Sequence, residues 1–125
     1  MRSLFHFAFN VTDLDAARRF YGDVLGCTVK DRWVQEGVLM GAELTAGDVR
    51  LMIGQDDWKQ GRDRVKGAGF RLYCSTTQDV DRLASQVKAS GGTLSYEPRD
   101  EWGMRAFAIE DPDGFKITIA KALKR

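Results

Sequence analysis

His6 is the only histidine of this sequence, and its side chain is the one best suited to proton transfer or metal binding near neutral pH. The imidazole can serve as a metal ligand or a general base, and it can equally be a hydrogen-bonded group in a cavity wall. Cys27 and Cys74 do not form a Cys-x-x-Cys pair, and each lies among apolar residues. We therefore expect two buried free thiols rather than a disulfide or a zinc site.

The rest of the sequence excludes several classes of function. It contains no Gly-x-Ser-x-Gly motif, no phosphate-binding loop and no zinc-finger spacing. With 19 basic and 18 acidic residues the net charge is +1, which predicts no nucleic-acid partner and no anionic membrane surface as partner. No signal peptide is recognisable, and no apolar run approaches the roughly 18 residues that span a bilayer. We therefore expect a cytoplasmic protein.

The elements that must position the candidate residues follow the same order in both halves of the chain. In the first half, residues 4–9 have the aromatic-rich pattern of a strand. Thr12 or Asp13 can cap a helix, which Gly26 ends. Three further strands are predicted at residues 28–35, 38–44 and 49–53.

The second half repeats this order after a polar linker. A strand at residues 70–75 precedes a helix at 79–90, and three strands follow at 93–97, 104–110 and 115–120. Each half is thus βαβββ. We expect a single α+β domain in which two βαβββ modules form a cup-shaped mixed sheet. Its predicted parts are module 1 at about residues 1–56, a linker at about 57–67 and module 2 at about 68–125.

The cup is the expected binding site, because each helix covers one face of its sheet and leaves the other face free. Alternation along residues 5–10 places the phenylalanines beneath the helix and directs His6 and Asn10 toward the cup. The strand at 70–75 is open to two registers. Hydrophobic alternation directs Arg71 and Tyr73 into the cup, whereas counting back from the helix start directs Leu72 there. We favour the first, because burying a guanidinium beneath a helix is costly.

Two stretches of the sequence resemble the opening and closing motifs of the vicinal-oxygen-chelate superfamily, which comprises glyoxalases, bleomycin resistance proteins and dioxygenases. The resemblance covers nearly the whole chain, and it implies the fold but not the reaction. The superfamily includes metal-dependent lyases, isomerases and oxygenases, and also metal-free proteins that sequester drugs. The matching stretches are Phe5–Asp15 with Arg19–Tyr21 and Val24–Gly26, and Trp102–Phe107 with Asp111-Pro112-Asp113-Gly114.

The resemblance also implies His or Glu metal ligands on the first and last strands of each module. His6 occupies one of these positions. The position on the last strand of module 2 holds Thr118, and the equivalent one in module 1 falls on Leu51 or Met52. The fourth position, on the strand at 70–75, holds no metal donor in either register. We therefore expect no metal and no other cofactor.

These observations predict a metal-free binding protein, resembling the bleomycin-resistance type, that sequesters or carries a planar organic or antibiotic-like molecule. The alternative is a glyoxalase- or dioxygenase-like enzyme, either metal-dependent or using His6 as a general base. Free sheet edges, and the dimers that the resemblance implies, predict a homodimer. The residues expected to contact the ligand are His6, Asn10, Arg71, Tyr73, Trp102 and Thr118.

Overall fold

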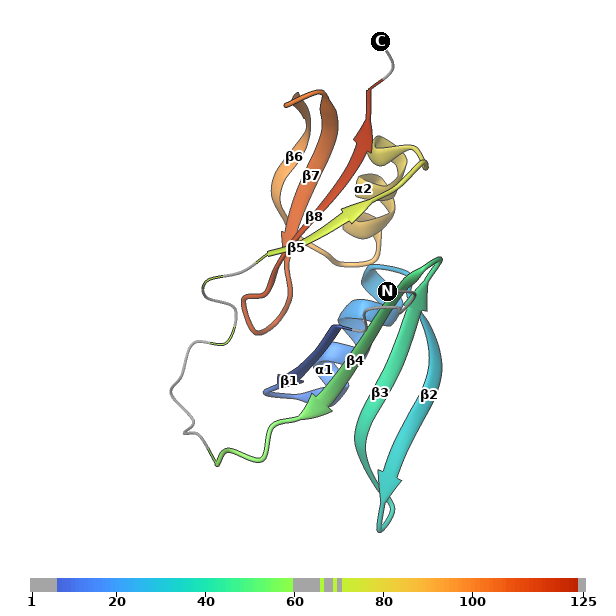
Figure 1. Cartoon of the computed structure of the whole chain (residues 1–125), viewed down its shortest axis with the longest axis vertical. Helices are drawn as coiled ribbons and strands as arrows, with labels where there is room; N and C mark the ends of the chain where they lie inside the picture. Colours follow the sequence, from blue (N-terminus) through green and yellow to red (C-terminus); the bar gives the residue numbers. More distant parts are fainter. Residues whose placement is uncertain (1–6, 60–65, 67–68, 70, 124–125) are drawn as a thin grey trace, which may run out of the picture. The chain divides into compact units, whose positions relative to one another are not determined.

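The computed structural model of the protein describes residues 7–59, 66, 69 and 71–123. The chain forms two compact units, residues 1–64 and residues 65–125. We call them module 1 and module 2 and describe each by itself (Figure 1). The fold is α+β, as the sequence predicts, and each module has the order βαβββ with a four-stranded mixed sheet.

Module 1 has one sheet with the strand order β1-β4-β3-β2. The first strand runs parallel to the last, and the other neighbours are antiparallel. In Figure 1 the helix lies behind β1 and β4, so that one face of the sheet is covered and the other is open. The elements are β1 (Phe7–Val11), α1 (Leu14–Arg19), the π-helical segment η1 (Phe20–Val24), β2 (Thr28–Gln35), β3 (Val38–Ala46) and β4 (Val49–Gln55).

The helix of module 1 departs from the single α-helix predicted up to Gly26. Asp13 caps its start, with the carboxylate accepting a hydrogen bond from the Ala16 N–H at 3.1 Å. After six residues the backbone hydrogen bonds change from α-helical to π-helical spacing. The Leu25 N–H donates to the Phe20 carbonyl at 3.0 Å. The fully buried Tyr21 lies in this π-helical turn. The spacing of apolar residues in the sequence does not predict such a change in helix type.

The core of module 1 lies between this helical segment and the sheet. Leu14, Ala17 and Tyr21 are buried on the helical side. Phe9 faces them from β1, since its ring centroid lies 5.8 Å from that of Tyr21 in an edge-to-face contact. Phe9 therefore lies on the helix-covered side, as the strand alternation predicts, and its neighbour Asn10 lies on the open face.

Gln55, at the end of β4, binds the chain between β1 and α1. Its side-chain oxygen accepts a hydrogen bond from the Leu14 N–H at 3.1 Å, and its side-chain nitrogen donates to the Thr12 carbonyl at 2.8 Å. One side chain thus satisfies a free N–H group of the first helical turn from 41 residues away.

Module 2 has one sheet with the strand order β5-β8-β7-β6, again with a parallel pair of first and last strands. The strand β6 is longer than the predicted 93–97, because its polar second half pairs with β7 as far as Glu101 and Met104. The elements are β5 (Arg71–Ser75), α2 (Val80–Ala89), β6 (Leu94–Glu101), β7 (Met104–Glu110) and β8 (Lys116–Ala122).

A two-residue turn joins β6 and β7. Trp102 and Gly103 have φ angles of 53° and 73°, as in the type I′ turns that match the twist of a hairpin. Glycine adopts such angles without strain, whereas tryptophan rarely does. A tryptophan at this position gives no turn signal, so the sequence does not predict the end of β6.

The helix α2 covers one face of the second sheet. Asp79 caps it, accepting from the Arg82 N–H at 3.2 Å. Its inner side carries the buried residues Val80, Ala84 and Val87. Phe107 and Ile109 of β7 are buried beneath them. Alternation along β7 then leaves Ala106 and Ala108 on the opposite, open face.

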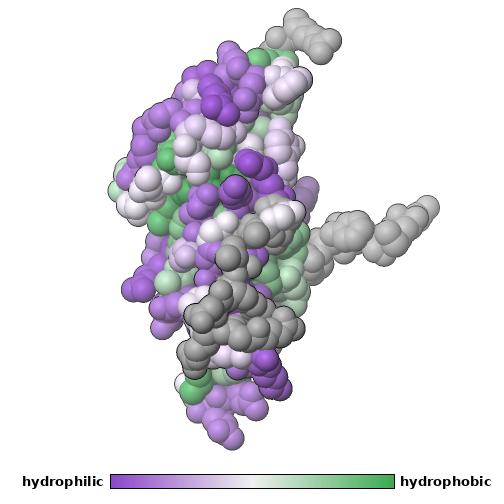
Figure 2. Space-filling model, turned by 90° about the vertical axis from the view of Figure 1, so that its left-hand side faces the viewer, coloured by the Kyte–Doolittle hydropathy of each residue, from purple (hydrophilic) through white to green (hydrophobic). Residues whose placement is uncertain are grey.

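The two cysteines are free thiols, as expected, but each is only half-buried. Burial nevertheless raises the pKa of the Cys74 thiol. Among the described helices, none is long and apolar enough to cross a membrane. On the face of the molecule shown in Figure 2, hydrophilic residues predominate and hydrophobic residues form smaller patches between them.

Candidate functional site

The open face of module 1 carries a row of residues that lie directly opposite one another across all four strands. The pairing registers align Asn10 of β1 with Gly54 of β4, Gly54 with Gly41 of β3, and Gly41 with Trp33 of β2. The row therefore ends in an amide on one side and an indole on the other. The two central positions have no side chain at all.

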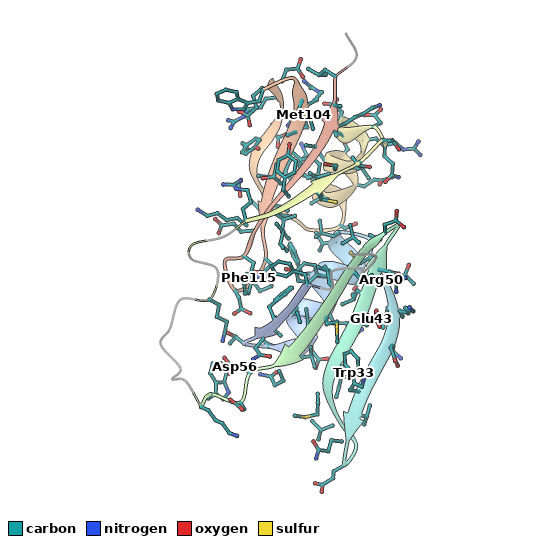
Figure 3. The ribbon with its side chains drawn as sticks, viewed as in Figure 1. Trp33, Glu43, Arg50, Asp56, Met104 and Phe115 are labelled. Carbon is teal, nitrogen blue, oxygen red and sulfur yellow. The ribbon has the colours of Figure 1, made fainter. Side chains whose placement is uncertain are left out.

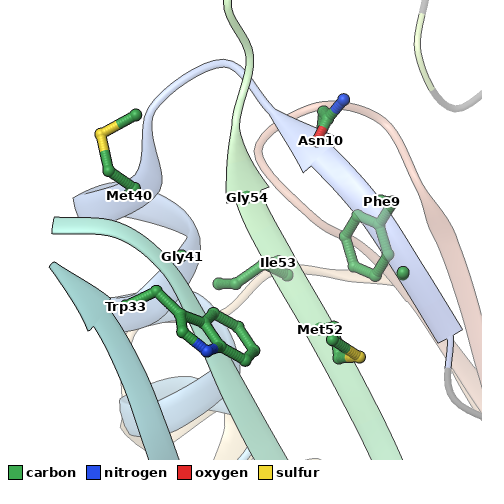
Figure 4. A pocket seen from close by; sticks show the side chains of 9 residues that line it. Phe9, Asn10, Trp33, Met40, Gly41, Met52, Ile53 and Gly54 are labelled. Carbon is green, nitrogen blue, oxygen red and sulfur yellow. The ribbon is translucent and has the colours of Figure 1, made fainter. Parts of the chain in front are cut away.

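A hollow with a volume of about 330 Å³ lies over this row (Figure 4). Asn10 is the polar side chain that lines it, and none of the lining residues is charged. Such a lining suits an apolar or aromatic molecule with one polar group. The lining residues are Ala8, Phe9, Asn10, Trp33, Met40, Gly41, Met52, Ile53 and Gly54.

The side chains at the two ends of the row, Asn10 and Trp33, lie close to the glycines beside them. A Cβ atom added to Gly41 would stand 2.8 Å from Cε3 of Trp33, so the indole already occupies that space. A Cβ atom added to Gly54 would stand 3.2 Å from Oδ1 of Asn10. The glycines are therefore required by the close approach of these two side chains, although neither has a positive φ angle.

An ion pair lies in the neighbouring part of the same face (Figure 3). The carboxylate of Glu43 and the guanidinium of Arg50 are 3.7 Å apart, and the Glu43 side chain is only 13% exposed. Pairing sets Glu43 directly opposite Met52. The two charges of this pair compensate each other, whereas Asp31 of β2, directly opposite Glu43, adds an exposed carboxylate to this part of the sheet.

The open face of module 2 has a row of the same kind. Tyr73 lies opposite Thr118, Thr118 opposite Ala108, and Ala108 opposite Tyr96. Here aromatic rings stand at both ends, with small residues between them. Thr118 is only 4% exposed, and its hydroxyl accepts a hydrogen bond from Nη1 of Arg71 at 2.8 Å. This bond and the half-buried Leu72 agree with the register that directs Arg71 and Tyr73 to the open face.

Arg71 differs from the other arginine on this face. Arg99 lies 3.7 Å from the centre of the Tyr96 ring and 3.3 Å from the carboxylate of Glu101, so its charge is compensated. For Arg71, no carboxylate among the described residues lies within ion-pair distance. Its exposed guanidinium keeps several donors for an external acceptor.

The predicted site residues therefore fall into separate groups. Asn10 lines the hollow of module 1, whereas Arg71, Tyr73 and Thr118 adjoin one another in module 2. Trp102 stands at the tip of the β6–β7 hairpin with its side chain 95% exposed. His6 lies outside the described residues.

Sequence reasoning places Trp33 only among the three tryptophans that could reach the rim of the cup, and it does not select Gly41 or Gly54. A signal for them was present, since glycine inside a strand commonly marks a close approach of another group. Within the described ranges, no group of three His, Cys, Asp or Glu residues is placed to hold a metal ion.

The family model named Glyoxalase/Bleomycin resistance protein/Dioxygenase superfamily matches residues 3–119. The chain belongs to this superfamily. Its known members differ in what they do, so membership leaves the activity open.

Three proteins of different kinds are similar to the chain. The "Probable lactoylglutathione lyase, chloroplastic" of Arabidopsis thaliana is 32% identical over 94% of the chain, which spans only 35% of that protein. The "Glutathione transferase FosA" of Serratia marcescens is 27% identical over 95% of the chain and 80% of its own length. TnmS3, an antibiotic binding protein from Streptomyces sp. CB03234, has a TM-score of 0.77 at 18% identity, covering 98% of the chain and 97% of its own. At this identity the likeness to TnmS3 shows the fold alone.

Proposed function

We propose that this protein is a metal-free binding protein that sequesters or carries a planar organic molecule. The observation that carries the proposal is the hollow of module 1, whose lining is apolar except for Asn10 and contains no charged side chain. A cavity of this kind gains affinity mainly by removing apolar ligand surface from water.

The residues at the superfamily's metal positions support the metal-free assignment. Met52 lies on the open face of β4, and its thioether suits soft ions rather than the hard or borderline divalent ions of such enzymes. Thr118 offers a neutral hydroxyl that already accepts from Arg71. Of the other two positions, His6 fills one with a possible ligand, and the one on β5 holds no metal donor, since the guanidinium of Arg71 has hydrogen-bond donors but no lone pair to offer.

The open face of module 2 supports the recognition of an anionic group. Arg71 has no compensating carboxylate among the described residues, Thr118 holds it, and Tyr73 beside it is 57% exposed. A carboxylate or phosphate could accept a charge-assisted hydrogen bond from the guanidinium. We further propose that the protein is a cytoplasmic homodimer.

A second candidate function is a glutathione-dependent enzyme. It is favoured by the printed names of two relatives, a lactoylglutathione lyase and a glutathione transferase. The plant relatives are much longer than the chain, which covers 35% to 44% of their length. This candidate requires either a metal held by an unusual ligand set or a base such as His6.

Elemental analysis and a glutathione titration separate the two functions. Protein purified without chelator is expected to carry far less than one equivalent of zinc, nickel, manganese or iron, and reduced glutathione is expected not to bind. Stoichiometric metal that disappears in His6→Ala protein would overturn the metal-free assignment.

A tryptophan fluorescence screen tests the binding site itself. In the double variant Trp58→Phe/Trp102→Phe, Trp33 is the only remaining tryptophan, so any emission change reports on the hollow. Flat aromatic compounds are expected to change its emission in a saturable way. A library of such compounds that leaves Trp33 emission unchanged would exclude the hollow as the binding site.

A further inference from the structure

We propose that the hollow of module 1 selects a neutral, planar ring system with an amide- or lactam-type edge, which stacks against Trp33 and pairs with the side-chain amide of Asn10. The inference rests on the proposed binding function and names the class of ligand for that site. It follows from the row of four residues across the sheet and from the charges around it.

The shape of the hollow calls for a flat molecule. Neighbouring strands are about 4.8 Å apart, so the strands of Asn10 and Trp33, three spacings from each other, are separated by about 14 Å. The positions between them are Gly41 and Gly54, whose bare backbone forms the floor. Trp33 and Asn10 both lean inward over this floor. A ring system can lie there with an edge toward Asn10 and a face or edge against the indole.

The chemistry of Asn10 defines the edge of that ring. Its side chain has no hydrogen-bond partner within the described part of the chain, and it lies on the exposed surface of the hollow. A side-chain amide presents one acceptor and an N–H donor side by side. The complementary arrangement is a donor beside an acceptor, which a lactam or a primary carboxamide provides.

The charges near the hollow favour a neutral ligand. The nearby Glu43 and Arg50 compensate each other, Asp31 opposite Glu43 adds a negative charge that disfavours an anion, and no lining residue is charged. A carboxylate entering the hollow would lose hydration without gaining a counter-ion, which is unfavourable. Aromatic and thioether groups at Trp33 and Met52 instead favour a polarisable ring.

Three bicyclic probes of almost equal size isolate the role of Asn10. Naphthalene has no hydrogen-bonding edge, quinoline has an acceptor alone, and 2-quinolone has the complete lactam edge. In the wild-type protein, 2-quinolone is expected to bind roughly tenfold more tightly than naphthalene, as a pair of neutral hydrogen bonds allows. In Asn10→Leu protein this preference is expected to vanish, with naphthalene bound at least as tightly as by the wild type.

The contact can also be observed directly, because Asn10 is the only asparagine in the sequence. Protein labelled with nitrogen-15 asparagine gives a single side-chain amide signal pair. That pair is expected to shift on titration with 2-quinolone and far less with naphthalene. The matched control is Gln86→Leu on α2, an exposed amide in module 2 that is expected to leave both affinities unchanged.

The outcomes distinguish this inference from the proposed function. If none of the probes shifts the indole N–H signal of Trp33, the hollow is not a binding site and the proposed function fails. If the probes bind but 2-quinolone and naphthalene are equal in wild type and Asn10→Leu, the binding function stands and the lactam inference is wrong. The preference for a neutral ligand is tested in Arg71→Ala protein, which lacks the guanidinium of module 2. If quinoline-2-carboxylate binds at Trp33 more tightly than 2-quinolone there, the preference for a neutral ligand is wrong. If Asn10→Leu does not fold, the Asn10 side-chain amide signal of the wild type provides the test. Equal shifts of that signal with 2-quinolone and with naphthalene would show that the lactam inference is wrong.

Discussion

The indole of Trp33 lies against the backbone of Gly41 in the space that any larger residue at this position would need. A Cβ at Gly41 would stand 2.8 Å from Cε3 of Trp33 and 3.0 Å from the carbonyl oxygen of Ile53. The second contact is with backbone of the neighbouring strand, which cannot move without breaking the β3–β4 ladder. The hollow of module 1 therefore depends on this glycine as much as on its aromatic wall.

Gly41→Ala is expected to lower the free energy of unfolding by about 1–3 kcal/mol, the usual range for overpacking, and to displace the indole of Trp33. Urea unfolding and Trp33 fluorescence measure the two effects. Gly22→Ala is the control, since its nearest foreign atom would be the Cys27 carbonyl oxygen at an ordinary 3.9 Å. Equal stabilities of the two variants would contradict the packing argument.

Arg71→Ala is expected to weaken the binding of anionic ligands to module 2 more than that of neutral ligands of the same shape. A hydrogen bond to a charged group contributes about 1.5–3 kcal/mol before the desolvation of both partners is subtracted. Calorimetric titration with 2-naphthoate and 2-naphthamide measures the difference. Arg82→Ala, an exposed arginine on α2, is expected to have no effect. If an anionic ligand binds wild type, Arg71→Ala and Tyr73→Ala with the same affinity, then Arg71 and Tyr73 do not belong to the binding site.

The pKa of Asp81 is expected to lie below its ordinary value. Arg105 holds the carboxylate with two hydrogen bonds, from Nε at 2.7 Å and from Nη2 at 2.8 Å, and this is the main cause of the lowering. Because the folded-state pKa is lower than the unfolded one, the pair contributes stability above the unfolded value. That contribution is lost as pH falls through the folded value.

Both groups of this pair are exposed, so the effect on stability is expected to be small. The clear readout is the carboxyl titration of Asp81 by nuclear magnetic resonance. Arg105→Gln is expected to raise the pKa of Asp81 toward its ordinary value, and Lys88→Gln, which removes the separate pair with Glu97, is expected to leave it unchanged. An unaltered Asp81 titration in Arg105→Gln would show that the pair does not form in solution.

A homodimer is expected, because β2 is an edge strand of its sheet and carries exposed apolar side chains. Trp33 is 40% exposed and Val34 61% exposed on that strand, and Val38 is 58% exposed on its hairpin partner. Edges of this kind are usually covered by another chain or blocked by charge. Multi-angle light scattering at micromolar concentration measures the mass, and a monomer there would rule out a stable dimer.

The order of elements could be predicted because caps, turns and alternation act over a few residues. Asp13 and Asp79 start their helices, and both parallel strand pairs follow from the βαβββ order. The row from Asn10 to Trp33 could not be predicted in the same way. It depends on three pairing registers at once, and the β2–β3 ladder shifts directly after Trp33. A single residue of slip would place a different side chain opposite Gly41.

The bond from Gln55 to the first turn of α1 has a consequence for how module 1 folds. A helix of six residues is too short to persist alone, and one of its first N–H groups finds its acceptor only when β4 has arrived. The helix is therefore a late product of tertiary assembly rather than a seed for it. Amide exchange at Leu14 should then follow the opening of the β1–β4 ladder, so that one proton reports on the cooperativity of the whole module.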